Sequence, residues 1–158
     1  MSPNQFFIFH DSIHFFISLI IGLLLSKIYK NRLIIFVSIF VGIFIDADHL
    51  VDLFLVYLNK FGLPIKVDKL ISLFYSPYMK EAGKIFVPLH SIDLLWVWWL
   101  IGRRLNPVFK VKGIEWAVSL SIITHILIDY ASYSPNPMAY FLLFRVINNF
   151  GRDSFSSF

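Results

Sequence analysis

The sequence predicts an all-α fold, an integral membrane helical bundle with four membrane helices and a short apolar segment that could add a fifth. Composition predicts the membrane class, because 58% of the 158 residues are hydrophobic and the mean hydropathy is +0.72. The distribution of the charged residues predicts the helices. These residues make up 15% of the chain and lie mainly between long apolar segments. Residues 1–158 are expected to form a single membrane-embedded domain.

The apolar segments justify each helix in turn. They run from Phe6 to Leu25, from Leu33 to Leu58, from Ile85 to Ile101, from Ile114 to Tyr130 and over residues 138–148. The first four approach or exceed the length of about 20 residues that crosses a bilayer. Tryptophans crowd the far end of the third segment, as at a headgroup layer. The fifth is short and contains Arg145, so we expect a short apolar or re-entrant helix there.

The segment between the second and third helices, residues 59–84, mixes polar and apolar residues. Within it, the run VDKLISLFYSPYM over 67–79 predicts a short helix that lies at the membrane interface. Loops 26–32 and 102–113 carry Lys and Arg with no acidic residue. The positive-inside rule places these two loops in the cytoplasm of a prokaryotic cell, with the N-terminus and residues 59–84 on the extracytoplasmic side.

Charge and cysteine content narrow the partners of the chain. The net charge of +4 comes from short loops between apolar segments, which favours a lipid bilayer as partner over nucleic acid. The chain has no cysteine, so a metal would be bound by histidine nitrogen and carboxylate oxygen alone.

Histidines and carboxylates occur together in the apolar segments, where ionisable residues are costly. All five histidines and six of the ten acidic residues belong to four sets: His10/Asp11/His14, Asp46/Asp48/His49/Asp52, His90/Asp93 and His125/Asp129. The helices alternate in direction, so the four sets fall in one leaflet, on the side of the N-terminus. Spacings of three or four residues place the side chains of a set on one helix face. Paired His and carboxylate ligands of this kind hold one or two metal ions in helical bundles.

Other interpretations of single residues stay open at the level of sequence. A lone His/Asp pair in a membrane helix is also typical of a structural hydrogen bond or a proton relay. Asp52 and Asp93 are candidates for orienting a ligand imidazole. His10 and Asp11, near the start of the first segment, are candidates for solvated residues.

Four runs of sequence, in order over about residues 14–140, resemble the YdjM-type family of predicted membrane-bound metal-dependent hydrolases: HFFISLIIG, GIFIDADH, LHS and SIITHILIDYASYSPNP. The resemblance implies the metal-site residues His14, Asp46, Asp48, His49, His90, His125 and Asp129. The chain departs from the family at Ile45, where the family has proline, and at 85–91, which lacks the first His and the Arg of the family's HRGxTHS motif. A distant similarity of the family to zinc-dependent phospholipase C implies phosphoester chemistry.

The leading functional prediction is a membrane-embedded metal-dependent hydrolase that acts on a phosphoester or lipid-linked substrate through a metal-activated water. With nitrogen and oxygen ligands alone, one or two zinc ions are favoured, and Mn, Fe or Mg are alternatives. Asp46 or Asp48 is the candidate general base. The alternative function is a metal-ion or proton transporter that uses the same His/Asp cluster. A di-iron oxidoreductase ranks last, because the multiple-His clusters of desaturases are absent.

Overall fold

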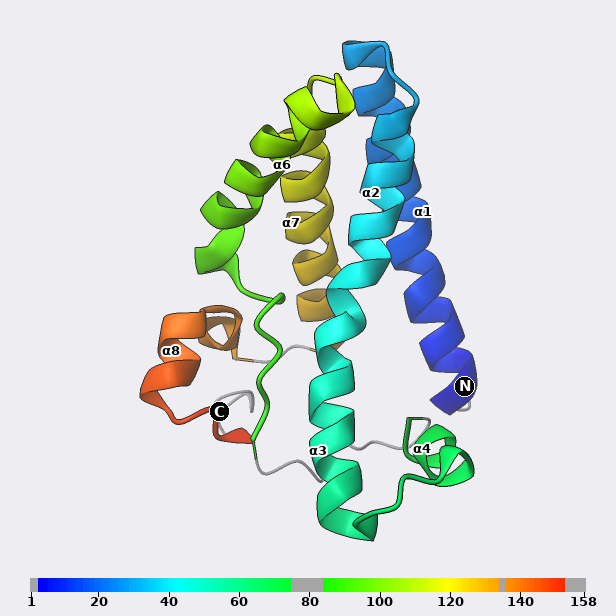
Figure 1. Cartoon of the computed structure of the whole chain (residues 1–158), viewed down its shortest axis with the longest axis vertical. Coiled ribbons are helices and arrows are strands. Elements are labelled where there is room, and N and C mark those ends of the chain that lie inside the picture. Colours follow the sequence, from blue (N-terminus) through cyan, green and yellow to red (C-terminus); the bar gives the residue numbers. More distant parts are fainter. Residues whose placement is uncertain (1–2, 75–83, 134–135, 153–158) are drawn as a thin grey trace.

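The computed structural model describes residues 3–74, 84–133 and 136–152, and the regular elements in these ranges are helices (Figure 1). The one β feature among them is an isolated antiparallel bridge between Lys84 and Gly151. The all-α prediction is therefore confirmed. Within the same ranges, three segments are long and apolar enough to cross a membrane: Phe9–Tyr29, Leu33–Phe61 and Ile114–Ser132. A fourth and a fifth membrane helix are not confirmed.

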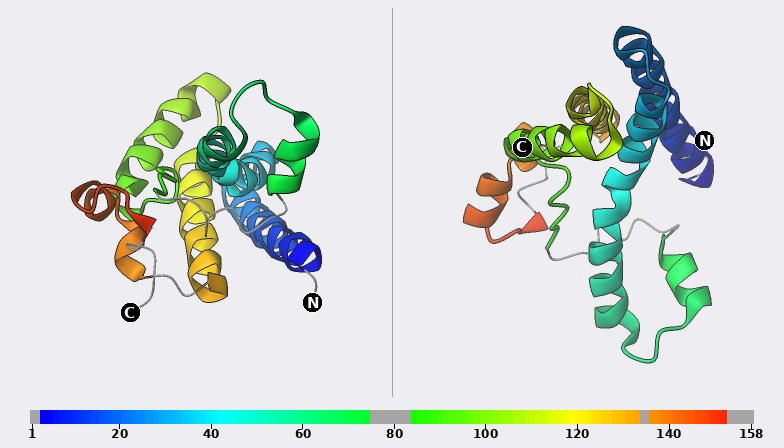
Figure 2. Two further views of the ribbon diagram at one scale, coloured as in Figure 1. Left: turned by 90° about the horizontal axis from the view of Figure 1, so that it is seen from below. Right: turned by 45° about the horizontal axis from the view of Figure 1, so that its top comes forward.

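The described helices are α1 (Pro3–Tyr29), α2 (Leu33–Phe44), α3 (His49–Phe61), α4 (Val67–Phe74), α6 (Leu95–Phe109), α7 (Ile114–Tyr133) and α8 (Leu142–Ile147), with 3-10 turns η1 (Ile45–Asp48), η2 (Ile92–Leu94) and η3 (Pro137–Tyr140). Helices α1, α2 and α7 pack against one another, and α6 packs along α7. Seen from below, α7 lies between α6 on one side and α1 on the other (Figure 2, left). The second predicted segment lies in one candidate span, Leu33–Phe61, in which the 3-10 turn η1 separates the α-helices α2 and α3.

The third predicted segment, Ile85–Ile101, differs most from expectation. Its first part is a loop with turns, and the helix proper begins only at Leu95 and continues to Phe109. Pro88 explains the difference, because proline lacks the backbone N–H of a helical hydrogen bond and restricts the residue before it. His90 therefore lies in a loop, and the predicted helical pairing of His90 with Asp93 is wrong.

Glycines bring the helices of the bundle close together. A Cβ atom added to Gly22 of α1 would lie 2.7 Å from the Cα of Ile35, and one added to Gly102 of α6 would lie 2.6 Å from the Cα of Glu115. Gly42 of α2 faces Ser18 of α1 in the same way. Such small residues are how membrane helices pack closely, and the close packing brings the polar faces of α1, α2 and α7 within reach of one another.

Apolar side chains occur on both the inside and the outside of the bundle. Ile34, Ile114 and Ala117 are fully buried in its core. Outside, large apolar side chains such as Ile28 and Phe36, each 69% exposed, face the surroundings. A surface of this kind is stable against lipid and costly against water. Together with the three candidate spans, it indicates a membrane protein.

The remaining segments fit the expectation in part. Helix α4 lies inside the predicted interfacial run 67–79, whose last residues fall outside the described part of the chain. The predicted segment 138–148 is divided between η3 and the six-residue α8, which is too short to cross a membrane. Arg145 of α8 is buried inside the protein.

Candidate metal centre

The turn η1 interrupts the second span in the middle of the bundle, where α2 gives way to α3 (Figure 1). Its sequence, IDAD, is followed by His49 at the start of α3. In a 3-10 turn the side chains three residues apart lie above one another, and the Asp46 Oδ1 and His49 Nε2 atoms are 3.7 Å apart. The interruption presents Asp46, Asp48 and His49 at the level of the polar residues of α1 and α7.

Three side chains from three separate segments, Asp46, His90 and His125, direct one ligand atom each at a common point, and Asp129 lies beside the two histidines. The Nε2 atoms of His90 and His125 are 3.2 Å apart. They lie 3.3 and 3.2 Å from Asp46 Oδ1 and 3.3 and 3.4 Å from Asp129 Oδ2. Tetrahedral zinc with bonds of about 2.0–2.1 Å places neighbouring ligand atoms about 3.3–3.4 Å apart. Asp46, His90 and His125 therefore have the mutual spacing of zinc ligands, and together with the adjoining Asp129 they are hereafter the first group.

The other ring nitrogen of His90 and of His125 is hydrogen-bonded to the protein. His125 Nδ1 donates to the carbonyl oxygen of Gly42 at 2.8 Å. His90 Nδ1 donates to both carboxylate oxygens of Asp48, at 3.1 and 3.2 Å. Each bond leaves the Nε2 lone pair directed into the first group, which is how metal-binding histidines are oriented. Two lone pairs 3.2 Å apart repel unless a cation or a proton lies between them.

A second group of donors meets on the other side of Asp129. His10 Nε2 lies 2.9 Å from His14 Nε2 and 3.1 Å from Asp129 Oδ1. His14 Nε2 lies 3.2 Å from the same oxygen. One oxygen of Asp129 adjoins His10 and His14 and the other adjoins His90 and His125, so this carboxylate joins the two groups. A shared carboxylate is compatible with the short metal–metal distance of about 3.5–4 Å in two-metal sites.

The structure brings all seven sequence-predicted metal-site residues together, in unequal positions. Five of them, His14, Asp46, His90, His125 and Asp129, direct ligand atoms into the two groups. Asp48 and His49 form a third possible group with His90. Asp48, however, already accepts hydrogen bonds from His90 Nδ1 and, at 2.7 Å, from the backbone N–H of Leu89. It orients His90, so its position resembles that of a supporting carboxylate more than that of a ligand.

The outer acidic residues differ from expectation. Asp52 accepts a hydrogen bond from the backbone N–H of Phe86 at 3.0 Å. Asp93 accepts from the N–H groups of Leu142 and Leu143, at the start of α8. The expectation that these two aspartates orient ligand imidazoles is therefore wrong, because both hold neighbouring backbone segments instead.

His10 corrects another prediction. It is not solvated, since it is only 7% exposed and belongs to the second group. The signal that could have found it is its spacing of four residues from His14, which places both imidazoles on one face of α1. Asp11, next to it, is exposed as expected.

Arg145 is a residue of the site that sequence reasoning missed. Its guanidinium is fully buried and donates to the carbonyl oxygens of Phe86 and Val87, both at 2.6 Å, and to the hydroxyl of Ser91. Burial lowers the pKa of Arg145, while nearby aspartates oppose that shift. The guanidinium thus fixes the loop on both sides of His90. The available signal was a charged residue in a short apolar segment.

The electrostatics of the loop favour a positive charge at the cluster. Burial alone lowers the pKa of His90, but hydrogen bonds to Asp129, Asp46 and Asp48 outweigh burial and raise the pKa well above its ordinary value. A site that stabilises a proton among carboxylates also attracts a metal cation, which competes for the same lone pair. The cluster is open at Asp46, whose side chain is 41% exposed, compared with 4% for His90.

Comparisons with known proteins supply no relative for this chain. No family model, curated protein or solved structure matched it. The resemblance to the YdjM-type family therefore stays a prediction based on the motifs of the chain.

Proposed function

We propose that this protein is a membrane-embedded metal-dependent hydrolase that acts on a phosphoester. The observation that carries the proposal is the pair of donor groups joined through Asp129, in which Asp46, His90 and His125 have the mutual spacing of zinc ligands. Sites that hold two metal ions about 3.5–4 Å apart are typical of enzymes that hydrolyse phosphoesters, and Asp129 would be the residue common to both ions. The motifs that resemble the YdjM-type family point to the same chemistry.

Nitrogen and carboxylate donors decide which metal is proposed. Imidazole suits zinc and iron, whereas magnesium prefers oxygen ligands and keeps several waters. Each of the two groups has two imidazole nitrogens among its donors. Zinc is therefore the favoured ion at both positions, with Fe and Mn as alternatives and Mg as the least suited. When bound, such an ion lowers the pKa of a water ligand and withdraws charge from the phosphoryl oxygens.

The side chains of the cluster have different proposed roles in hydrolysis. His90 and His125 hold their ring orientation through Asp48 and Gly42, so the reacting atoms meet a fixed arrangement. Asp48 is buried and engaged, and this leaves the half-exposed Asp46 as the proposed general base. Water gives its hydroxyl group to phosphorus, the P–O bond to the leaving alcohol breaks, and Asp46 carries the proton from the water to that alcohol.

Metal stoichiometry tests the centre directly. We expect wild-type protein that is purified without chelators to contain two transition-metal ions per chain, most of them zinc, as measured by elemental mass spectrometry. His10→Ala removes a donor of the second group alone and should leave one ion, whereas His125→Ala should remove the ion of the first group. Asp11→Asn is the matched control, because this acidic residue lies beside His10 and is exposed. A wild-type protein without stoichiometric metal would remove the proposal.

Hydrolysis requires a second measurement. Metal-loaded wild type should cleave a phosphodiester such as bis-p-nitrophenyl phosphate, and the rate should fall by about 100-fold or more in Asp46→Asn. Activity that persists in both Asp46→Asn and His125→Ala would exclude this assignment.

A metal-ion or proton transporter is the second candidate, and one feature favours it. Ser18 on α1 and Ser121 on α7 lie about one helical turn from His14 and His125, and Ser38 on α2 lies about two turns from Asp46. All three serines are buried, so the interior stays polar beyond the cluster. At the next turn, Ile34 and Ala117 are fully buried and close the interior. Metal uptake into proteoliposomes, without hydrolysis, would favour transport over the proposed function.

A further inference from the structure

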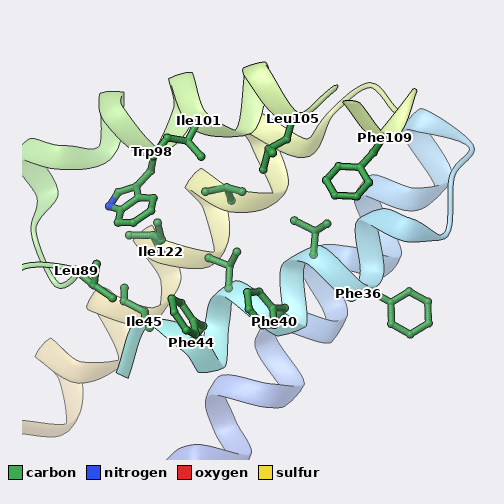
Figure 3. A pocket seen from close by; sticks show the side chains of 13 residues that line it. Phe36, Phe40, Phe44, Ile45, Leu89, Trp98, Ile101, Leu105, Phe109 and Ile122 are labelled. Atoms are coloured by element: carbon green, nitrogen blue, oxygen red, sulfur yellow. The ribbon is translucent and has the colours of Figure 1, made fainter. Parts of the chain in front are cut away.

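A long apolar groove runs along the outside of the bundle, between α2, α6 and α7 (Figure 3). Its volume is about 470 Å³. The side chains that line it are Phe36, Val37, Phe40, Val41, Phe44, Ile45, Leu89, Trp98, Ile101, Leu105, Phe109, Val118 and Ile122. All of them are hydrocarbon except for the indole nitrogen of Trp98. The groove therefore suits a hydrocarbon ligand and offers almost nothing to a polar one.

The length and exposure of the groove fit one lipid chain. Along α2 it extends from Phe36 to Ile45, which at 1.5 Å per residue is about 14 Å, roughly half of the 30 Å hydrocarbon layer. Phe36, Phe40 and Phe44 are more than half exposed, on a helix that is long and apolar enough to cross the membrane. The opening of the groove is thus accessible to the chains of surrounding lipids.

One end of the groove adjoins the candidate metal centre. Ile45 lines the groove and directly precedes Asp46, and Leu89 lines it and directly precedes His90. The backbone N–H of Leu89 also donates to Asp48 at 2.7 Å, so the same residue contacts both regions. A molecule with a polar head at the His/Asp cluster would therefore have its hydrocarbon tail beside the residues that directly precede Asp46 and His90 in the chain.

We propose that the groove binds one acyl chain of a membrane phospholipid whose phosphoester lies at the His/Asp cluster. The inference rests on the proposed hydrolase function and specifies its substrate class. The length of the groove favours an acyl chain over a polyisoprenyl chain, because the groove matches one leaflet and a polyisoprenyl chain is longer. Annular lipid would cover the apolar faces evenly, whereas a substrate chain is held in the groove by its headgroup.

Photolabelling tests the position of the chain without relying on activity. The probe is phosphatidylglycerol with a diazirine near the end of one palmitoyl chain, in vesicles that contain the full-length, zinc-loaded protein. We expect labels on residues 36–45 and 98–109, and we expect chelation of the metal to reduce this labelling by about tenfold. Labels that spread evenly over the lipid-facing helices would overturn the proposal. So would a probe that undecaprenyl phosphate displaces but dipalmitoyl phosphatidylglycerol does not.

A pair of substitutions on α6 separates the groove from the general surface. Leu105→Trp fills the groove, and Leu100→Trp makes the same change at an exposed leucine that does not line it. Leu105→Trp should reduce labelling of the groove about tenfold and raise the KM for phosphatidylglycerol about tenfold. Its hydrolysis of bis-p-nitrophenyl phosphate should stay within about twofold of wild type. In the Leu100→Trp variant, the labelling, the KM and the hydrolysis should all stay within about twofold of wild type.

The outcomes distinguish the inference from the proposed function. If wild type cleaves neither phosphodiester, hydrolysis is wrong, and the labelling pattern still decides whether the groove holds an acyl chain. If it cleaves both substrates and Leu105→Trp changes neither KM nor labelling, the hydrolase stands and the groove proposal is wrong.

Discussion

His90 and His125 belong to the same cluster, but a loop positions the first and a helix positions the second. His125 lies on α7, a continuous helix of 20 residues that packs against α1, α2 and α6. His90 lies in a loop whose position depends on individual polar contacts with Arg145, Asp48 and Asp52. The helix places its ligand through packing along its whole length, whereas the loop does so through a few hydrogen bonds. Each of those bonds can be removed separately, so the two supports should respond differently to substitution.

The largest effect is expected for Arg145→Ala, which leaves the buried carbonyl groups of Phe86 and Val87 without their donor. We expect the free energy of unfolding to fall by about 2–4 kcal/mol and the first group to lose its ion. Unfolding in mixed detergent micelles and elemental analysis measure the two effects. Arg104→Ala, an exposed arginine on α6, is the control. An Arg145→Ala protein that keeps both stability and metal would mean that the loop supports itself.

Asp48→Asn should have an intermediate effect confined to the loop ligand. The amide can donate to His90 Nδ1 instead of accepting from it, and this moves the imidazole proton to the Nε2 atom that faces the first group. Loss of such a supporting carboxylate typically weakens metal binding about 10–100-fold. Competition with a zinc-binding dye measures the affinity, and Asp68→Asn, on the exposed surface of α4, is the control. Equal affinities for the two variants would contradict the assigned role of Asp48.

The smallest effect is expected for Asp52→Asn. Asparagine retains an oxygen that can accept from the backbone N–H of Phe86, so only the charge of this acceptor is lost. We expect the free energy of unfolding to fall by about 1 kcal/mol, with the metal content unchanged. A drop in metal content as large as that of Asp48→Asn would show that Asp52 acts on His90 more directly than its contacts suggest.

The contrast between the two supports also explains what the sequence could predict. The helices α1 and α7 follow from their apolar length, and the convergence of their His and Asp residues follows from helix periodicity and alternating direction. Residues 85–94 have an apolar composition like that of a helix, and only Pro88 argues against one. The hydrogen bonds that define this loop come from Asp52 and from Arg145, which is distant in the sequence. Contacts of that kind leave no periodic pattern in the sequence.

The supporting role of Asp48 illustrates a second limit of sequence reasoning. Asp46 and Asp48 stand two residues apart in the same motif and are chemically identical. Only the arrangement in space separates them, with Asp46 directed into the first group and Asp48 behind His90. His10 shows the opposite case, because its spacing from His14 contained the information and its place near the start of α1 concealed it.

Gly42 takes part both in the packing of the bundle and in the proposed metal centre. Its lack of a side chain lets α2 approach Ser18 of α1, and its carbonyl oxygen accepts the proton of His125 Nδ1. A bundle in which α1, α2 and α7 have separated has no such site, so an ion that binds only the assembled helices stabilises the assembly by mass action. If the centre holds metal as proposed, removal of the metal should therefore lower the stability of the helix bundle as well as the proposed activity.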